Sequence, residues 1–276
     1  MMFVWHRGRV RNASEVQIDL SDSIFEHGLG LFETFRSWNR RVPLLHSHLA
    51  RWIRSGRELG LADLQAFDVP SVDDVRKLLE TLRLDDALLR LTRTGGARGR
   101  EPSAWLRASP LPPAGPIAGL TLIETPWRID RADPLARHKT LNYWSRRRAF
   151  EHAVAAGAHE GLLFDHEGSP WEGSRTNLFV VLDDRILTPT LEGPIVPGVM
   201  RAAVVDVAGA LGFDVEECTL AREDLLDARE IFLTNSVRGI MPVERILGDS
   251  AWQAPGRPVT SRELAAAIDS HLGTLA

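Results

Sequence analysis

The stretch WEGSRTNLF, residues 171–179, places one carboxylate, Glu172, just ahead of the strongly apolar run 177–182. An apolar run of this length, bounded by polar and glycine residues, is typical of a buried strand. A carboxylate at the edge of such a strand is either an ordinary hairpin-edge acid or a group that pairs with a buried cation. The stretch therefore predicts a core strand, with Glu172 as a candidate functional residue.

Lysine is the rarest basic residue in the chain. Of the 33 basic residues only Lys77 and Lys139 are lysines, and an arginine in their place stays protonated and cannot form a Schiff base. Lys77 lies in the amphipathic run 71–79, where a surface lysine is ordinary. Lys139 lies in RHKTLNY, residues 137–143, which has no helical apolar stripe. Lys139 is thus a candidate for amine chemistry, with a plain surface lysine as the alternative.

Hydrophobic periodicity outward from these two segments predicts both helices and strands. Helices are expected over 46–60, 71–83, 144–157, 199–211 and 261–273. Strands are expected within 2–18 and over 31–36, 87–92, 120–124, 161–165, 177–182, 186–188 and 231–234. The elements do not alternate strictly, so we expect an α+β fold with mixed sheets in two domains.

The clearest linker is SPLPPAGP, residues 109–116, because clustered proline and glycine interrupt regular structure. We therefore expect a small N-terminal α+β domain over 1–109, a linker over 110–117 and a larger C-terminal domain over 118–276.

Composition and charge narrow the classes of partner and site that this chain is expected to have. The net charge of −4 gives no reason to expect a nucleic-acid or membrane partner. The single cysteine, Cys218, excludes an internal disulfide and a cysteine-built metal site, and we expect no metal. The N-terminus has too short an apolar run for a signal peptide, and no run approaches the roughly 20 apolar residues of a membrane span. A cytoplasmic location is the expectation.

A Schiff-base lysine usually needs a carbonyl cofactor, of which pyridoxal phosphate is the common case. The phosphate of this cofactor needs a helix N-terminus or an arginine as its ligand, and the ring nitrogen needs an acidic partner to stay protonated. The helix start after Pro197-Gly198, the turn Thr234-Asn235-Ser236 and Arg51 could supply the phosphate ligands. Taken singly, these are equally typical of an ordinary helix start, a polar turn and a surface arginine.

Taken in order, the motifs resemble one family. The runs 32–36, 48–51, 139–143, 172–179, 197–201 and 234–237 are similar to those of the class IV pyridoxal-phosphate enzymes. That family includes branched-chain aminotransferases, D-amino acid aminotransferases and aminodeoxychorismate lyase. The resemblance extends from about residue 3 to residue 247, and the Glu-Gly-Ser-x-x-Asn-Leu-Phe signature, 33 residues after Lys139, is its most specific part.

The resemblance implies a fold-type-IV enzyme, similar to D-amino acid aminotransferase, that forms homodimers and binds its cofactor between two domains. It implies that Lys139 holds pyridoxal 5'-phosphate as a Schiff base and then moves protons, and that Glu172 pairs with the ring nitrogen. The remaining cofactor contacts that it implies are Arg51, Val199, Met200, Asn235 and Ser236 for the phosphate and Tyr143 for the ring hydroxyl.

The reaction is less closely specified. Thr34 and the turn Thr-Asn-Ser-Val at 234–237 resemble the lyases, as does the loop that contains Arg93 and Arg98. These two arginines could anchor the substrate carboxylates, or could belong to a solvated basic loop. We therefore expect an aminodeoxychorismate lyase, which releases pyruvate from 4-amino-4-deoxychorismate to give 4-aminobenzoate for folate synthesis. The alternatives are a transaminase of branched-chain L- or D-amino acids and their keto acids, and a pyridoxal-phosphate-binding protein without turnover.

Overall fold

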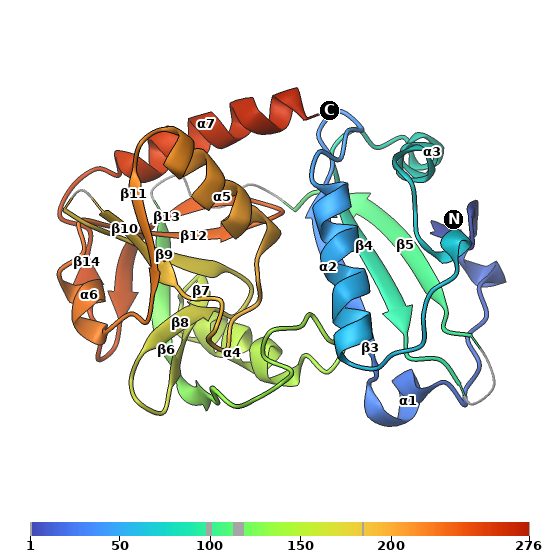
Figure 1. Ribbon diagram of the computed structural model, residues 1–276, viewed down its shortest axis with the longest axis horizontal. Coiled ribbons are helices and arrows are strands. Elements are labelled where there is room, and N and C mark those ends of the chain that lie inside the picture. The colour runs from blue at the N-terminus through green and yellow to red at the C-terminus, as the bar shows by residue number, and fades with distance from the viewer. Residues whose placement is uncertain (1, 98–100, 113–118, 184, 276) are drawn as a thin grey trace. The chain divides into compact units, whose positions relative to one another are not determined.

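The computed structural model describes residues 2–97, 101–112, 119–183 and 185–275, and the chain divides into two compact units (Figure 1). Unit 1 comprises Met1–Pro113, His138–Asn142 and Leu275–Ala276, and unit 2 comprises Ala114–Arg137 and Tyr143–Thr274. Most of the expected linker, from residue 113 onward, lies outside the described residues. None of the helices in the described parts of the chain has the length and apolar character needed to cross a bilayer.

Unit 1 is built on one sheet with the strand order β2-β1-β5-β4-β3. Its strands are β1 (Phe3–His6), β2 (Arg9–Asn12), β3 (Gly30–Arg36), β4 (Ala87–Thr94) and β5 (Ala104–Pro110). Every pair of neighbours in this order runs antiparallel. The α+β expectation is confirmed, but the mixed sheet expected for the N-terminal domain is wrong, because even β3 and β4, which the two main helices of the unit separate in sequence, pair antiparallel.

Two long helices cover one face of this sheet. The helices of unit 1 are α1 (Ser23–His27), α2 (Leu45–Glu58) and α3 (Val72–Leu82), with 3-10 turns at Ala13–Glu15 and Ala66–Asp68. Helix α3 begins at a capping box, in which the Ser71 hydroxyl accepts from the Asp74 N–H at 3.2 Å and the Asp74 carboxylate accepts from the Ser71 N–H at 3.0 Å. Trp52 of α2 is 1% exposed in the core between α2 and the sheet.

The segment around Lys139 packs on β3, although the stretch Ala114–Arg137 of unit 2 separates it in sequence from the rest of unit 1. The Phe32 N–H donates to the Lys139 carbonyl at 2.9 Å, and the Leu141 N–H donates to the Gly30 carbonyl at 2.9 Å. A Cβ atom at residue 30 would lie 2.6 Å from Leu141 Cδ1, so glycine is required for this close approach. Residues 138–142, expected in the C-terminal domain, therefore belong to the first unit.

Unit 2 contains a nine-stranded sheet, of which six strands close on themselves. The ring runs β9-β12-β13-β6-β7-β8 and back to β9, and β10, β11 and β14 extend it. Parallel pairs such as β6 with β7 occur beside antiparallel ones, so this sheet is mixed as expected. The strands are β6 (Leu120–Ile129), β7 (Glu160–Asp165), β8 (Pro170–Gly173), β9 (Asn177–Leu182), β10 (Arg185–Pro189), β11 (Asp214–Cys218), β12 (Glu230–Asn235), β13 (Gly239–Leu247) and β14 (Trp252–Gln253).

The helices of unit 2 pack around this sheet. They are α4 (Trp144–Ala155), α5 (Val199–Ala210), α6 (Arg222–Leu226) and α7 (Thr260–Thr274), and α5 and α7 lie side by side (Figure 1). Phe179 of β9 and Phe232 of β12 stack with ring centroids 4.8 Å apart in the core. The apolar runs that predicted β9 and β12 thus form the centre of the unit.

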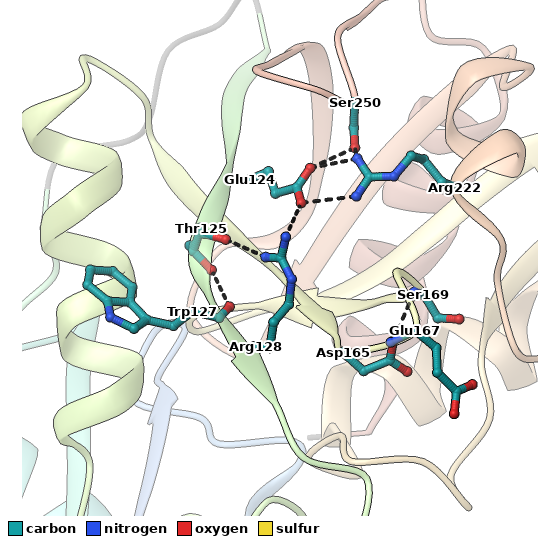
Figure 2. Close-up of polar contacts among 9 residues, drawn as sticks. All are labelled: Glu124, Thr125, Trp127, Arg128, Asp165, Glu167, Ser169, Arg222 and Ser250. Carbon is teal, nitrogen blue, oxygen red and sulfur yellow. Dashed lines mark hydrogen bonds and ion pairs between the residues drawn. The ribbon is translucent and has the colours of Figure 1, made fainter.

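A partly buried carboxylate ties three parts of unit 2 together where the pairing of β6 with β7 is irregular. The pairing of β6 with β7 shifts register between Glu124 and Arg128, and Figure 2 shows Glu124 held by Arg128, Arg222 and Ser250. Glu124 accepts from Arg222 Nη1 at 2.6 Å, from Arg128 Nη2 at 2.9 Å and from Ser250 Oγ at 3.0 Å. The cluster links β6 to α6 and to the turn after β13.

This cluster makes stability depend on pH. The hydrogen bond from Arg222 lowers the pKa of Glu124, burial opposes it, and the Ser250 hydroxyl and the arginine charges add to the lowering. A lowered pKa in the folded state stabilises the fold above the ordinary glutamate value of about 4.3, and this stabilisation is lost as the pH falls through the folded value.

Between about pH 5 and pH 3, wild type should therefore lose more unfolding free energy than Glu124→Gln in urea titrations. Glu263→Gln, on the exposed side of α7, should retain the wild-type slope, and equal slopes for all three proteins would contradict the prediction.

Candidate functional site

Lys139 lies against the face of the unit 1 sheet that the helices leave uncovered. Its Nζ is 4.6 Å from the centroid of the Phe32 ring. Alternate residues of a strand share a face, so Thr34 lies on the same side of β3 as Phe32. The guanidinium carbon of Arg90, which pairs with Thr34 across β3 and β4, is 3.8 Å from the centroid of the same ring. Unit 1 thus brings Lys139 and Thr34 to one sheet face, with Arg90 beside them.

Arg51 lies on the opposite side of β3, where α2 packs. Its Nε donates to Glu33 Oε1 at 2.8 Å and its Nη2 to Glu33 Oε2 at 2.5 Å, and His48 Nδ1 lies 2.8 Å from the same Oε2. Arg51 is 6% exposed and Glu33 is 1% exposed. Arg51, predicted from its place beside an apolar stripe, is therefore buried and held by a bidentate contact with a carboxylate.

The protonation states in this cluster follow from burial and charge. Burial alone would raise the pKa of Glu33, but the charge of Arg51 and the hydrogen bonds from His48 and Arg51 lower it to about 2. Burial lowers the pKa of His48, although its hydrogen bond with Glu33 opposes this. Glu33 is thus ionised and His48 neutral at neutral pH, and the ionised Glu33 fixes the Arg51 guanidinium.

Arg93 does not occupy the position expected for a substrate anchor. Its side chain is 2% exposed on the helix side of β4, its Nη2 donates to the Ala62 carbonyl, and its guanidinium carbon is 5.8 Å from the Trp52 ring centroid. These contacts give Arg93 a structural role in the core of unit 1, because they leave it almost no solvent-exposed surface. Arg98 lies outside the described residues.

Glu172 is the centre of the polar cluster in unit 2. It is 1% exposed, and its Oε1 accepts from Arg146 Nη2 at 2.5 Å. The Val196 N–H donates to Oε2 at 3.2 Å, and Asn177 Nδ2 donates to Oε2 at 3.4 Å. A buried carboxylate paired with a cation stays ionised, which is the state that a protonated pyridine nitrogen requires.

Tyr143 is the N-cap of α4 in the same unit. Its hydroxyl donates to the Ser174 carbonyl at 3.0 Å. Burial, the largest cause, raises the pKa of Tyr143, so the phenol keeps its proton at neutral pH. The hydrogen bond to the chain just after Glu172 fixes the phenol in the neighbourhood of the carboxylate.

The expected phosphate ligands of unit 2 lie at two chain turns. Helix α5 begins at Val199, and its N-cap, Gly198, provides no side-chain cap; a Cβ atom there would lie 1.9 Å from Asn177 Oδ1. Met200 supplies the next amide of this helix start. In the other turn Asn235 Oδ1 accepts from the N–H groups of Val237 and Arg238 at 3.0 and 2.8 Å. The partly buried Ser236 lies inside that turn.

These features fit a phosphorylated pyridine cofactor. The uncapped start of α5 offers backbone donors of the kind that bind phosphate. The hydroxyl oxygen of Thr234, just ahead of Asn235, is buried without a hydrogen-bond partner among the described residues. The buried, cation-paired Glu172 suits a pyridinium nitrogen. Among the described residues no group of three or more histidines, cysteines or acids is arranged to hold a metal.

Four residues of these clusters had no role assigned from the sequence: Glu33, His48, Arg146 and Asn177. Glu33 is an acid in the middle of an apolar strand, and His48 lies three residues before Arg51 on one helix face, so a search for buried charge pairs would find both. Arg146 is one of three consecutive arginines at 146–148, and its orientation toward Glu172 has no local sequence signal.

Comparison with known proteins gives the family. The model of the family described as amino-transferase class IV matches residues 30–246. A Methanocaldococcus jannaschii protein named "Putative branched-chain-amino-acid aminotransferase" is 31% identical over 83% of this chain and 84% of its own length. The D-alanine aminotransferase of Bacillus licheniformis is 26% identical over 100% and 99%. The crystal structure of a Legionella pneumophila "Putative 4-amino-4-deoxychorismate lyase" superposes with a TM-score of 0.82 at 26% identity, covering 95% of this chain and 96% of that one. The chain, with its α+β architecture of one antiparallel and one mixed sheet, is therefore an enzyme of the class IV pyridoxal-phosphate-dependent aminotransferase family.

Proposed function

We propose that this protein is a pyridoxal-phosphate-dependent transaminase that exchanges the amino group of either a branched-chain L-amino acid or a D-amino acid for a keto oxygen. The observation that carries the proposal is that curated relatives matching most of this chain and most of their own length are named as branched-chain and D-alanine aminotransferases. This reverses the order of the two reactions expected from Thr34 and the 234–237 turn.

The proposed roles follow from the chemistry of each group. The cofactor, when bound, supplies an electron sink for the substrate's α-carbon. Lys139 binds the cofactor covalently through Nζ and then carries the proton between two carbon atoms. Glu172 keeps the ring nitrogen protonated, and Tyr143 binds the ring hydroxyl. Arg51, the amides of Val199 and Met200, and the turn at Asn235 and Ser236 bind the phosphate, and Thr34 lines the substrate side.

Homodimer formation, which the family resemblance implies, stays a prediction for this chain. So does the role of the phosphate ligands.

One assay tests the proposal directly. Purified protein with pyridoxal 5'-phosphate is incubated with 2-oxoglutarate and L-leucine, L-valine, L-isoleucine or D-alanine, and keto-acid formation is measured. The same preparation is incubated with 4-amino-4-deoxychorismate, and 4-aminobenzoate is measured. Keto acid from at least one amino acid, with little 4-aminobenzoate, is the expected result. 4-Aminobenzoate without keto acid would overturn the transaminase proposal.

The lyase is the second candidate. It is favoured by the similarity to the Legionella structure and by Thr34, which shares a strand face with Phe32, the ring beside Lys139. A carrier of the cofactor without turnover would bind the cofactor and give neither product. The same assay therefore separates all three.

A further inference from the structure

Arg146 is the one member of an exposed basic run that turns inward. It lies in the first turn of α4, with Ala149 and Ala153 on the buried face of the same helix. Its side chain is 12% exposed, whereas that of the adjacent Arg147 is 65% exposed and pairs with Glu151. Helical geometry thus separates two neighbouring arginines into a buried one and a solvated one.

The inward Arg146 is attached at two points. Its Nη2 donates to Glu172 Oε1 at 2.5 Å and to the Ala136 carbonyl at 3.2 Å. Burial, the largest single cause, would lower the pKa of Arg146, but the charge and hydrogen bond of Glu172 together with the charges of Tyr143 and Glu160 outweigh it, and the net direction is upward. The guanidinium therefore stays charged where it meets the carboxylate.

Two neutral donors of unit 2 lie farther from Glu172 than Arg146 does. The Val196 N–H and the Asn177 amide lie 3.2 and 3.4 Å from Oε2. A carboxylate buried with neutral donors alone would incur a desolvation cost that favours its protonated form. Arg146 supplies a full positive charge that offsets this cost.

The titratable groups of unit 2 that interact with Arg146 do not replace its positive charge. Tyr143 at the N-cap of α4 and Glu160 on β7 interact with Arg146, and both would add negative charge near Glu172 on ionisation. Arg175, in the turn before β9, is directed to Glu160, with Nε 3.5 Å from Oε2 and a side chain 46% exposed. Each of the two buried acids thus has its own arginine.

We propose that Arg146 is the positioning residue of Glu172: it holds this carboxylate ionised and oriented for the ring nitrogen of the cofactor. This rests on the proposed use of pyridoxal phosphate and extends it. Arg146 acts through Glu172. It sets the lower limit of the pH range in which the Glu172 carboxylate is ionised and accepts a hydrogen bond from the protonated ring nitrogen. Without Arg146 the buried acid takes up a proton at higher pH and competes with the ring for it.

The test measures cofactor binding, not turnover. Cofactor-free protein is titrated with pyridoxal 5'-phosphate from about pH 5 to pH 9, and Kd is obtained from the quenching of tryptophan fluorescence. For Arg146→Gln the pH at which affinity falls on the acid side should rise by roughly 1–3 units, the size of the effect of a nearby opposite charge. Arg146→Lys, which keeps the charge, should restore most of the wild-type profile. Arg147→Gln is the matched control and should superpose on wild type.

A double variant separates this role from a merely structural one. If Arg146 acts through Glu172, Arg146→Gln should leave the pH profile unchanged in a Glu172→Gln background. The double variant removes both charges of the pair, so it should fold even where Arg146→Gln alone does not. A wild-type profile in Arg146→Gln, or a double variant whose profile differs from that of Glu172→Gln, would overturn the inference. Wild-type protein that binds no pyridoxal phosphate would instead overturn the proposed function.

Discussion

Lys139→Arg protein should bind pyridoxal phosphate without a covalent bond and should lose transaminase activity by roughly 10⁴-fold or more, since it loses both a covalent and an acid–base step. Arginine keeps the positive charge near Phe32, 4.6 Å from Nζ in the wild type, but cannot form the bond. The segment should remain in place, because the hydrogen bonds that attach residues 139–141 to β3 come from the main chain. The effect should therefore be chemical, not structural.

Borohydride reduction measures the covalent bond apart from activity. In wild type, reduction should fix the cofactor on Lys139, found by mass spectrometry of proteolytic peptides. Lys77→Arg, on the exposed face of α3, is a matched control, because these two are the only lysines in the chain. It should keep both the adduct and the activity. A reducible cofactor bond that survives in Lys139→Arg or Lys139→Ala would show that Lys139 is not the attachment site.

Glu33→Gln should destabilise unit 1 by about 3–5 kcal/mol, the usual cost of leaving a buried charge without its partner. Glu33 accepts both hydrogen bonds of a bidentate contact with Arg51 and also contacts His48. All three side chains are almost fully buried. The amide keeps the shape of the side chain and removes the charge, so Arg51 would remain charged and uncompensated. Urea unfolding monitored by circular dichroism measures the loss.

The double variant Glu33→Leu/Arg51→Met gives the contrast for this prediction. Because both charges are removed together, it should be clearly more stable than Glu33→Gln. Glu80→Gln, on the exposed side of α3, should change stability by less than about 0.5 kcal/mol. If Glu33→Gln is no less stable than Glu80→Gln, the Glu33–Arg51 pair does not support the fold as described.

Strongly apolar or strongly periodic segments were predictable from local sequence. The runs that form β9 and β12 are apolar enough to identify a buried strand, and the helices α2 and α3 carry clear stripes. The strands that were not predicted are β5, β13, β14, the short strand β8 and the charged strand β11. β8 is fully buried but has only four residues, too few to show a period, and β11 is largely exposed and pairs only with β10 at the sheet edge.

The candidate chemistry is encoded locally, and its electrostatic environment is not. Lys139 and Glu172 were recognisable because lysine is rare in this chain and because the signature around Glu172 is contiguous. The burial of Arg93 against Trp52, the Glu33–Arg51 pair and the Arg146–Glu172 pair follow from long-range packing. Sequence patterns indicate which residues can carry charge, but the tertiary fold determines which charges lose contact with water, and burial is what makes a charge pair strong and its loss costly.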